Sequence, residues 1–106
     1  MRVLVTGATG KVGSAVTQHL ANSGIPTTAA SRSAASAQSH LGLGDRVGYM
    51  DFDFRQPAGF AKALDGKTHV FLVAPNNLQD AELLIQFIHQ AQAHKNVEHI
   101  TLLSGR

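Results

Sequence analysis

Short apolar runs alternate with helix-like patterns along the whole chain. Residues 3–5 form an apolar run that ends at Thr6-Gly7, which is typical of a parallel strand buried on both faces. Comparable runs predict four further strands, over residues 25–30, 46–52, 69–74 and 97–103. Because parallel strands need crossover connections, the segments between them are expected to be helices.

Helical signals fill the four gaps between the predicted strands. Apolar positions recur at helical spacing between residues 12 and 20, and Gly24 can take the left-handed conformation that ends a helix. The other helices are predicted over residues 33–41, from Pro57 to Gly66, and over residues 79–95. Five strands joined by four helices predict an α/β fold with a parallel sheet covered on both faces.

Three glycines follow the first predicted strand directly. They lie in the order Thr6-Gly7-Ala8-Thr9-Gly10-Lys11-Val12-Gly13, at the start of the first helix. Gly7 allows a sharp turn, Gly10 leaves room for a pyrophosphate, and Gly13 lets the helix pack closely on the sheet. Free N–H groups at the helix start would face the phosphates. The pattern predicts a dinucleotide site; the alternative is a tight turn without a ligand.

Composition narrows the class of protein. The chain has 106 residues, of which 43% are hydrophobic and 15% charged, so we expect one folded domain over residues 1–106. It has no cysteine, and its six histidines lack the convergent spacing of metal ligands, so no metal is expected. The net charge is only +2, and the nine Lys and Arg residues are scattered along the chain. No apolar run is long enough to span a bilayer. We therefore expect a soluble, cytoplasmic protein with neither nucleic acid nor membrane as a partner.

The string TGATGKVG at residues 6–13 resembles the nucleotide loop of NmrA-like proteins. These are atypical short-chain dehydrogenase/reductases that include quinone reductases and redox-sensing regulators. Looser similarities occur at residues 30–33, 51–52, 71–75 and 102–104. The resemblance covers essentially the whole chain but only the N-terminal part of such proteins, so the domain is expected to be truncated after its fifth strand. It implies a Rossmann-type three-layer sandwich with a five-stranded parallel sheet in the order 3-2-1-4-5.

The resemblance also implies a function. The chain would bind NAD(P) as part of an NAD(P)H-dependent oxidoreductase acting on a quinone or another small carbonyl compound; a non-catalytic NADP-binding redox sensor is the alternative. Classical short-chain reductases use a Tyr with a Lys four residues later. The only tyrosine, Tyr49, lies in the third predicted strand and is followed four positions later by Asp53. We therefore expect no catalytic residue in this chain.

The end of the second predicted strand bears on the choice of nucleotide. NAD-binding loops place an acidic residue about 20 positions beyond the glycines, where it binds the ribose 2′-hydroxyl. Here the segment is Ser31-Arg32-Ser33, and a guanidinium pairs with the 2′-phosphate that a carboxylate would repel. The two hydroxyls could add hydrogen bonds, and Lys11 a second cation. This predicts NADP(H) in preference to NAD(H), with plain solvent-facing charges as the alternative for Arg32 and Lys11.

The remaining site residues follow from the resemblance. Asp51 would accept a hydrogen bond from the adenine amino group, with a helix or turn cap as the alternative. Phe52 would contact the adenine through its backbone or border the ring. Residues 73–75 would line the cofactor, although Val73 could equally be core, and Ser104 would approach the nicotinamide. The predicted cofactor-binding residues are Gly7, Ala8, Thr9, Gly10, Lys11, Val12, Gly13, Ser31, Arg32, Asp51, Phe52, Val73, Ala74 and Pro75.

The last predicted helix carries more apolar residues than one face can hold. Its expected core stripe is Ala81, Leu84, Ile85 and Ile88, while Leu83 and Phe87 form a second apolar patch. Apolar residues of the fifth strand would also face water on one side. The second patch is expected to pack against another element or chain. Because this helix often forms the dimer interface in proteins of the resembling family, we predict a homodimer through residues 79–95.

Overall fold

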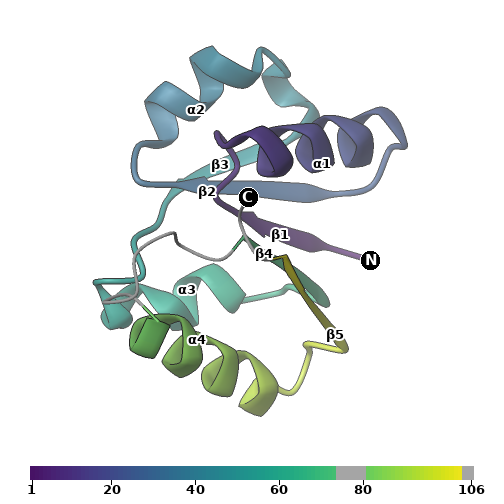
Figure 1. The fold of residues 1–106 in the computed structure, drawn as a ribbon. Helices are drawn as coiled ribbons and strands as arrows, with labels where there is room; N and C mark the ends of the chain where they lie inside the picture. Colours follow the sequence, from purple (N-terminus) through teal and green to yellow (C-terminus); the bar gives the residue numbers. More distant parts are fainter. Residues whose placement is uncertain (74–80, 104–106) are drawn as a thin grey trace.

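The computed structural model describes residues 1–73 and 81–103, and Figure 1 shows its alternating strands and helices. Two short 3₁₀ helices span Gly44–Arg46 and Pro57–Gly59. In chain order the elements are β1 (Val3–Thr6), α1 (Lys11–Asn22), β2 (Thr27–Ser31), α2 (Ala34–Leu41), β3 (Gly48–Asp51), α3 (Phe60–Leu64), β4 (His69–Val73), α4 (Ala81–Ala93) and β5 (His99–Leu103).

The five strands form one parallel sheet in the order β3-β2-β1-β4-β5. β1 lies at its centre, where Val3 is paired with Thr27 of β2 on one side and with His69 of β4 on the other. The first two helices cover one face of the sheet, and α3 and α4 cover the opposite face (Figure 1). The predicted Rossmann-type sandwich and its strand order are therefore confirmed.

Three strands begin later than predicted, each for a local reason. β2 begins at Thr27, directly after Pro26, which has no N–H to donate to a neighbouring strand. β3 begins at Gly48 because residues 44–46 form the 3₁₀ helix, closed by a bond from the Arg46 N–H to the Leu43 carbonyl oxygen (3.2 Å). β5 begins at His99 because residues 94–97 turn out of α4.

The helix ends agree closely with the sequence patterns. Gly24 has a φ of +74°, and its N–H donates to the carbonyl oxygen of Ala21 at 3.1 Å. The next N–H, of Ile25, reaches back to Leu20 at 3.0 Å, which completes a Schellman motif. Gly42 ends α2 in the same left-handed conformation. These caps fix where the chain leaves α1 and α2.

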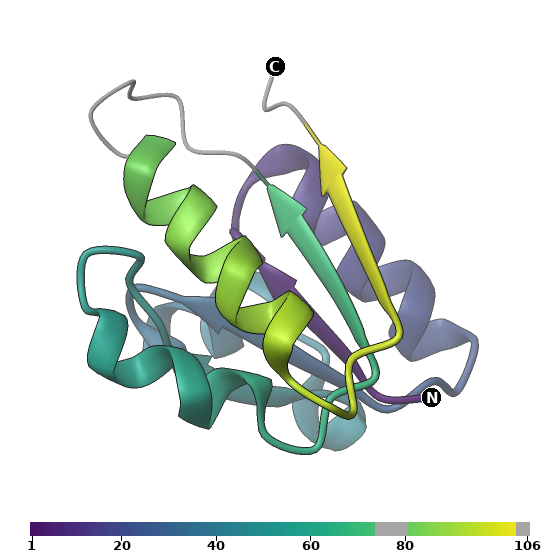
Figure 2. The ribbon, with the colours of Figure 1, turned by 90° about the horizontal axis from the view of Figure 1, so that it is seen from below.

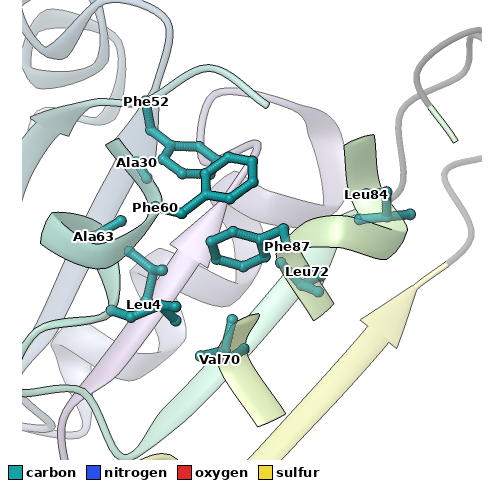
Figure 3. Close-up of a cluster of buried hydrophobic side chains, with 11 residues drawn as sticks. Leu4, Ala30, Phe52, Phe60, Ala63, Val70, Leu72, Leu84 and Phe87 are labelled. Carbon is teal, nitrogen blue, oxygen red and sulfur yellow. The ribbon is translucent and has the colours of Figure 1, made fainter. Parts of the chain in front are cut away.

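An aromatic cluster fills the core between the sheet and the α3–α4 layer (Figure 3). Phe87 of α4 meets Phe60 of α3 edge to face, with ring centroids 5.0 Å apart, and meets Phe52 at 5.3 Å. All three rings are buried, together with Leu4 and Leu72 from the sheet beneath them. Edge-to-face pairs add about 0.5–1.5 kcal/mol each beyond burial, so this cluster sets how α4 is oriented.

The core stripe predicted for α4 is wrong at one position. Ile85, predicted in the core, is 52% exposed, whereas Phe87 of the second patch is fully buried. Phe87 thus packs against another element of the same chain, which is one of the two outcomes expected for that patch. The reason is the aromatic cluster. Because Phe87 packs against the Phe60 ring of α3, the side of α4 that carries Ile85 faces solvent. Leu84 and Ala91 complete the buried face.

β5 forms one edge of the sheet, and Figure 2 shows it beside β4 with its arrowhead pointing to the same side. Leu102 is 50% exposed on this strand, so the expectation that apolar residues of β5 face water is confirmed. On the face of the sheet that α1 and α2 cover, a hollow of about 440 Å³ separates α1 from β4 and β5. Its lining is mainly apolar and includes Val16, Leu20 and Phe71.

Candidate nucleotide-binding site

The carboxyl ends of the parallel strands bring the predicted site residues to one edge of the sheet. The glycine loop leaves β1 there, Arg32 follows β2, and Asp51 ends β3. The register pairs Thr6 with Ala30 and Ser31 with Asp51, so the three strand ends are neighbours. In open α/β sheets this edge is where ligands bind.

The glycine loop is a tight turn in which two glycines are sterically required. Gly7 has a φ of +65°, in the left-handed region, and its carbonyl oxygen accepts from the Gly10 N–H at 3.0 Å. A Cβ on Gly13 would lie 2.0 Å from the Gly7 carbonyl oxygen, so α1 can pack against the loop only with glycine at this position. A Cβ on Gly10 would lie 3.3 Å from the same oxygen, which is tight but less restrictive. The roles predicted for Gly7 and Gly13 agree with this geometry.

The start of α1 has the properties of an anion site. Gly10 is the N-cap residue and provides no side-chain cap, and the first turn has no acidic residue. The N–H groups of Lys11, Val12 and Gly13 open the helix, where such groups have no partner within the helix itself. Together with the positive end of the helix dipole, these groups suit a phosphate. A pyrophosphate therefore fits this turn, and the cofactor's own charge would supply the missing cap.

Other residues of the loop are divided between core and surface. Ala8 is buried, and its N–H donates to the Ala30 carbonyl oxygen at 3.3 Å, which ties the loop to β2. Thr9 is exposed and faces a shallow hollow that α2 lines with Ser36, Ser39 and His40. The Lys11 side chain is also exposed. None of these positions contradicts the sequence prediction.

At the end of β2, the Arg32 side chain is exposed and the Ser31 side chain is buried. Ser31 is buried, and its hydroxyl donates to the Ser33 carbonyl oxygen at 2.8 Å, so its proton is already used inside the loop. The Ser33 hydroxyl accepts from the Ser36 N–H at 3.2 Å and caps α2, which leaves its own proton available to a ligand. Of the two hydroxyls expected beside a 2′-phosphate, only that of Ser33 can donate without breaking an existing hydrogen bond.

The Asp51 carboxylate has a structural partner. Its Oδ1 accepts from the Ala34 N–H at 2.7 Å, which is the capping interaction considered as the alternative for this residue. Phe52 follows it with a buried ring inside the aromatic cluster, and its N–H donates to the Ser31 carbonyl oxygen at 2.7 Å. Both residues nevertheless line an open hollow of about 250 Å³ at this edge.

This hollow also contains residues that sequence reasoning missed. Its lining combines Arg32, Asp51 and Phe52 with Asp53, Gln56 and Gly59. The last three lie on the stretch that leads from β3 into α3, beyond the last position matched in the third-strand motif. Their proximity to the carboxyl end of β3 was the available signal, because connections at that edge fold over the ligand side of the sheet.

The fourth strand contributes Val73 to the site edge. Its N–H donates to the Thr6 hydroxyl at 3.2 Å, and its Cβ would stand 3.2 Å from a Cβ placed on Gly7. Val73 therefore borders the glycine loop directly. The predicted residues Ala74, Pro75 and Ser104 lie outside the described part of the chain.

Other candidate chemistry lies away from this edge. Tyr49 is in the middle of β3, opposite Ala29, and its hydroxyl is buried without a hydrogen-bond partner among the described residues. His69 and His99 stack at the amino ends of β4 and β5, with ring centroids 5.1 Å apart. Across residues 1–73 and 81–103, no cluster of three or more His, Cys, Asp or Glu could hold a metal ion. Nor does any helix in these two ranges have the length and hydropathy needed to cross a membrane.

A parallel sheet with a glycine loop opening its first helix defines a dinucleotide-binding Rossmann domain. The model of the NAD(P)H-binding family matches residues 7–105, so the chain belongs to that family. No curated protein shows significant similarity to the sequence. The family match confirms the predicted NAD(P)-type ligand.

Solved structures of reductases share the fold. Triphenylmethane reductase from Citrobacter sp., complexed with NADP(H), is 27% identical with a TM-score of 0.72; the match covers 96% of this chain and 36% of that one. The NADPH-dependent quinone oxidoreductase from Escherichia coli, complexed with NADPH, is 26% identical with a TM-score of 0.77, covering 94% and 35%. Yeast methylglyoxal/isovaleraldehyde reductase, at 20% identity and a TM-score of 0.78 over 96% and 37%, shows the fold alone. The resemblance to NmrA-like, atypical short-chain reductases is confirmed, and the chain spans about a third of the length of these proteins.

Proposed function

We propose that the chain binds NADP(H) in preference to NAD(H), with the pyrophosphate at the glycine loop and the 2′-phosphate at Arg32. The observation that carries this proposal is the exposed Arg32 guanidinium at the end of β2. Among the described residues it has no hydrogen-bond or ion-pair partner. A free guanidinium beside the ribose position attracts a phosphate and offers it two parallel hydrogen bonds.

The hollow beside Arg32 suits the adenine ring. Asp51 uses Oδ1 for the Ala34 N–H, so its other carboxylate oxygen could accept from the adenine amino group. The edge of Phe52 and the backbone around Gly59 would border the ring. The two reported structures that are more than 25% identical to this chain are complexed with NADP(H) or NADPH, which supports the same nucleotide here. The glycine loop, the edge of β4 and this hollow would then hold the two halves of the cofactor.

For the whole protein we propose NAD(P)H-dependent reduction of a quinone or another small carbonyl compound. The cofactor supplies the hydride, and residues 1–106 bind and orient it. A redox sensor without catalytic activity is the second candidate. Tyr49 does not discriminate between the two candidates: it is partly buried in mid-strand on β3 and has Asp53 rather than Lys four residues later, which fits both equally well. An assay of NADPH oxidation with quinone acceptors separates the two candidates.

Self-association through α4 is proposed as well. The apolar residues that could form the contact are Ile85 of α4, 52% exposed, and Leu102 of β5, 50% exposed. Leu102 lies on β5, the outer strand on one side of the sheet, and Ile85 lies on α4, the helix that precedes this strand. Exposed apolar side chains at such an edge are typical of surfaces that pack against a partner.

Calorimetric titration with NADPH and with NADH tests the nucleotide proposal. Loss of charge-assisted hydrogen bonds in Arg32→Ala should weaken NADPH binding about 10- to 100-fold and leave NADH binding nearly unchanged. Lys62→Ala, which removes an exposed cation on α3, should bind both nucleotides like the wild type. Equal losses for both nucleotides in Arg32→Ala, or no loss at all, would contradict the proposed 2′-phosphate site.

A further inference from the structure

Resting on the proposed NADP(H) site, we propose that Asp51 is a positioning residue that acts through Arg32. Its carboxylate joins the end of β3 to the start of α2 and thereby holds the intervening turn in place. This role is separate from any contact between Asp51 and the adenine. It would make one side chain of β3 a determinant of nucleotide specificity without contact with the 2′-phosphate.

Two contacts of Asp51 bracket Arg32 along the chain. On one side, Asp51 is paired in register with Ser31 across the β2–β3 ladder. On the other side, its Oδ1 accepts from the Ala34 N–H at 2.7 Å, the short distance expected for a charge-assisted bond. Because Ser31 and Ala34 flank Arg32 closely, the backbone of Arg32 is held from both directions.

Further hydrogen bonds stiffen the same turn. The Phe52 N–H donates to the Ser31 carbonyl oxygen at 2.7 Å, and the Ser31 hydroxyl donates to the Ser33 carbonyl oxygen at 2.8 Å. The Ser33 hydroxyl accepts from Ser36 at the start of α2. Arg32, on this fixed backbone, is exposed. A guanidinium on a fixed base loses less conformational freedom when it binds a phosphate.

The charge of Asp51 does not cancel that of Arg32. The two side chains line the same hollow, yet no ion pair joins them among the described residues. The carboxylate instead faces the amino end of α2, where the helix dipole favours a negative charge. Asp51 therefore supports Arg32 through geometry, and an acceptor oxygen at the same place should serve nearly as well as a carboxylate.

A double-mutant cycle tests this role. NADPH and NADH affinities are measured by calorimetry for the wild type, Asp51→Ala, Arg32→Ala and the double variant. Loss of the adenine contact in Asp51→Ala lowers both affinities alike, so we expect this variant to weaken NADPH binding about five- to tenfold more than NADH binding. In the Arg32→Ala background, Asp51→Ala should no longer change the ratio of the two affinities, because the residue through which it acts is gone.

Two conservative variants separate geometry from charge and keep the fold. Asp51→Asn retains an acceptor oxygen without the charge and should keep the wild-type preference for NADPH. Asp51→Glu retains the charge but displaces the acceptor, and should lose part of that preference. Asp45→Ala, which removes an exposed carboxylate in the 3₁₀ helix before β3, is the matched control and should behave like the wild type.

The possible failures are distinguishable. If the wild type binds neither nucleotide, or if Arg32→Ala leaves the ratio of affinities unchanged, the proposed 2′-phosphate site and the role of Asp51 both fall. If Arg32→Ala removes the preference but Asp51→Ala weakens both nucleotides equally, Asp51 acts at the adenine and only the present inference is overturned. The same holds if Asp51→Glu keeps the preference and Asp51→Asn loses it.

Discussion

Gly13 is the residue on which the packing of the glycine loop most clearly depends. Alanine is normally favoured over glycine inside a helix by about 1 kcal/mol. Here a Cβ would lie 2.0 Å from the Gly7 carbonyl oxygen, so α1 must move away from the loop. We expect Gly13→Ala to lower the free energy of unfolding by about 1–3 kcal/mol despite the better helix propensity. NADPH affinity, measured by calorimetry, should fall at least about tenfold.

Gly59→Ala is the matched control for the effect of this substitution on stability. A Cβ on Gly59 would have no heavy atom within 4 Å, and the residue has an ordinary negative φ of −88°. The stability of this variant in urea should equal or exceed that of the wild type. Wild-type NADPH binding by Gly13→Ala would show that the close contact between α1 and the loop is not needed for the site.

Single residues also show where sequence reasoning stops. The need for glycine at positions 7 and 13 could be predicted, because turn geometry and close packing exclude a side chain there. The hydrogen bond from the Ser31 hydroxyl to the Ser33 carbonyl oxygen could not be predicted. Local geometry decides whether a short polar side chain bonds to a ligand or to the backbone. The role of Asp51 was open for the same reason, and its bond to Ala34 is visible only in three dimensions.

At the scale of elements, α4 shows the limit of a periodic pattern. Its apolar residues 83–85, 87 and 88 allow two orientations of the helix, and the sequence alone does not choose between them. The choice is made by Phe60 and Phe52, which lie far away in sequence and receive the Phe87 ring. The succession of strands and helices along the chain was predictable, because each element follows from the local period of its apolar residues. The orientation of α4 was not, because it depends on contacts between elements.

The outward orientation of Ile85 makes the proposed self-association through α4 testable. We expect the wild type to be a dimer at tens of micromolar, and Ile85→Lys to be a monomer because a charge would replace the apolar contact. Gel filtration with light scattering measures both. Gln90→Lys, an exposed position elsewhere on α4, is the control and should remain dimeric. A monodisperse wild-type monomer at this concentration would contradict the proposed interface.

Across the whole molecule, the carboxyl ends and the amino ends of the strands form two opposite edges of the sheet, and these two edges carry different chemistry. The carboxyl edge holds the glycine loop, Arg32 and Asp51, whereas the amino edge brings Lys67 close to Arg2. Burial lowers the pKa of Lys67 below its ordinary value of 10.5; Asp65 opposes this shift and Arg2 adds to it. Charge at the amino edge should therefore affect the stability of the fold without reaching the nucleotide site.

Lys67→Met should change the pH dependence of stability and leave NADPH affinity unchanged. With its pKa lowered, native Lys67 loses its proton at a lower pH than it does in the unfolded chain. Between the two pKa values the unfolded chain binds more protons, so the free energy of unfolding rises with pH through that interval. Methionine removes this contribution, so the stability of the wild type relative to the variant should increase from neutral pH towards 10.5. Urea unfolding over that range measures the difference, and parallel profiles for the two proteins would show that Lys67 is not desolvated in the fold.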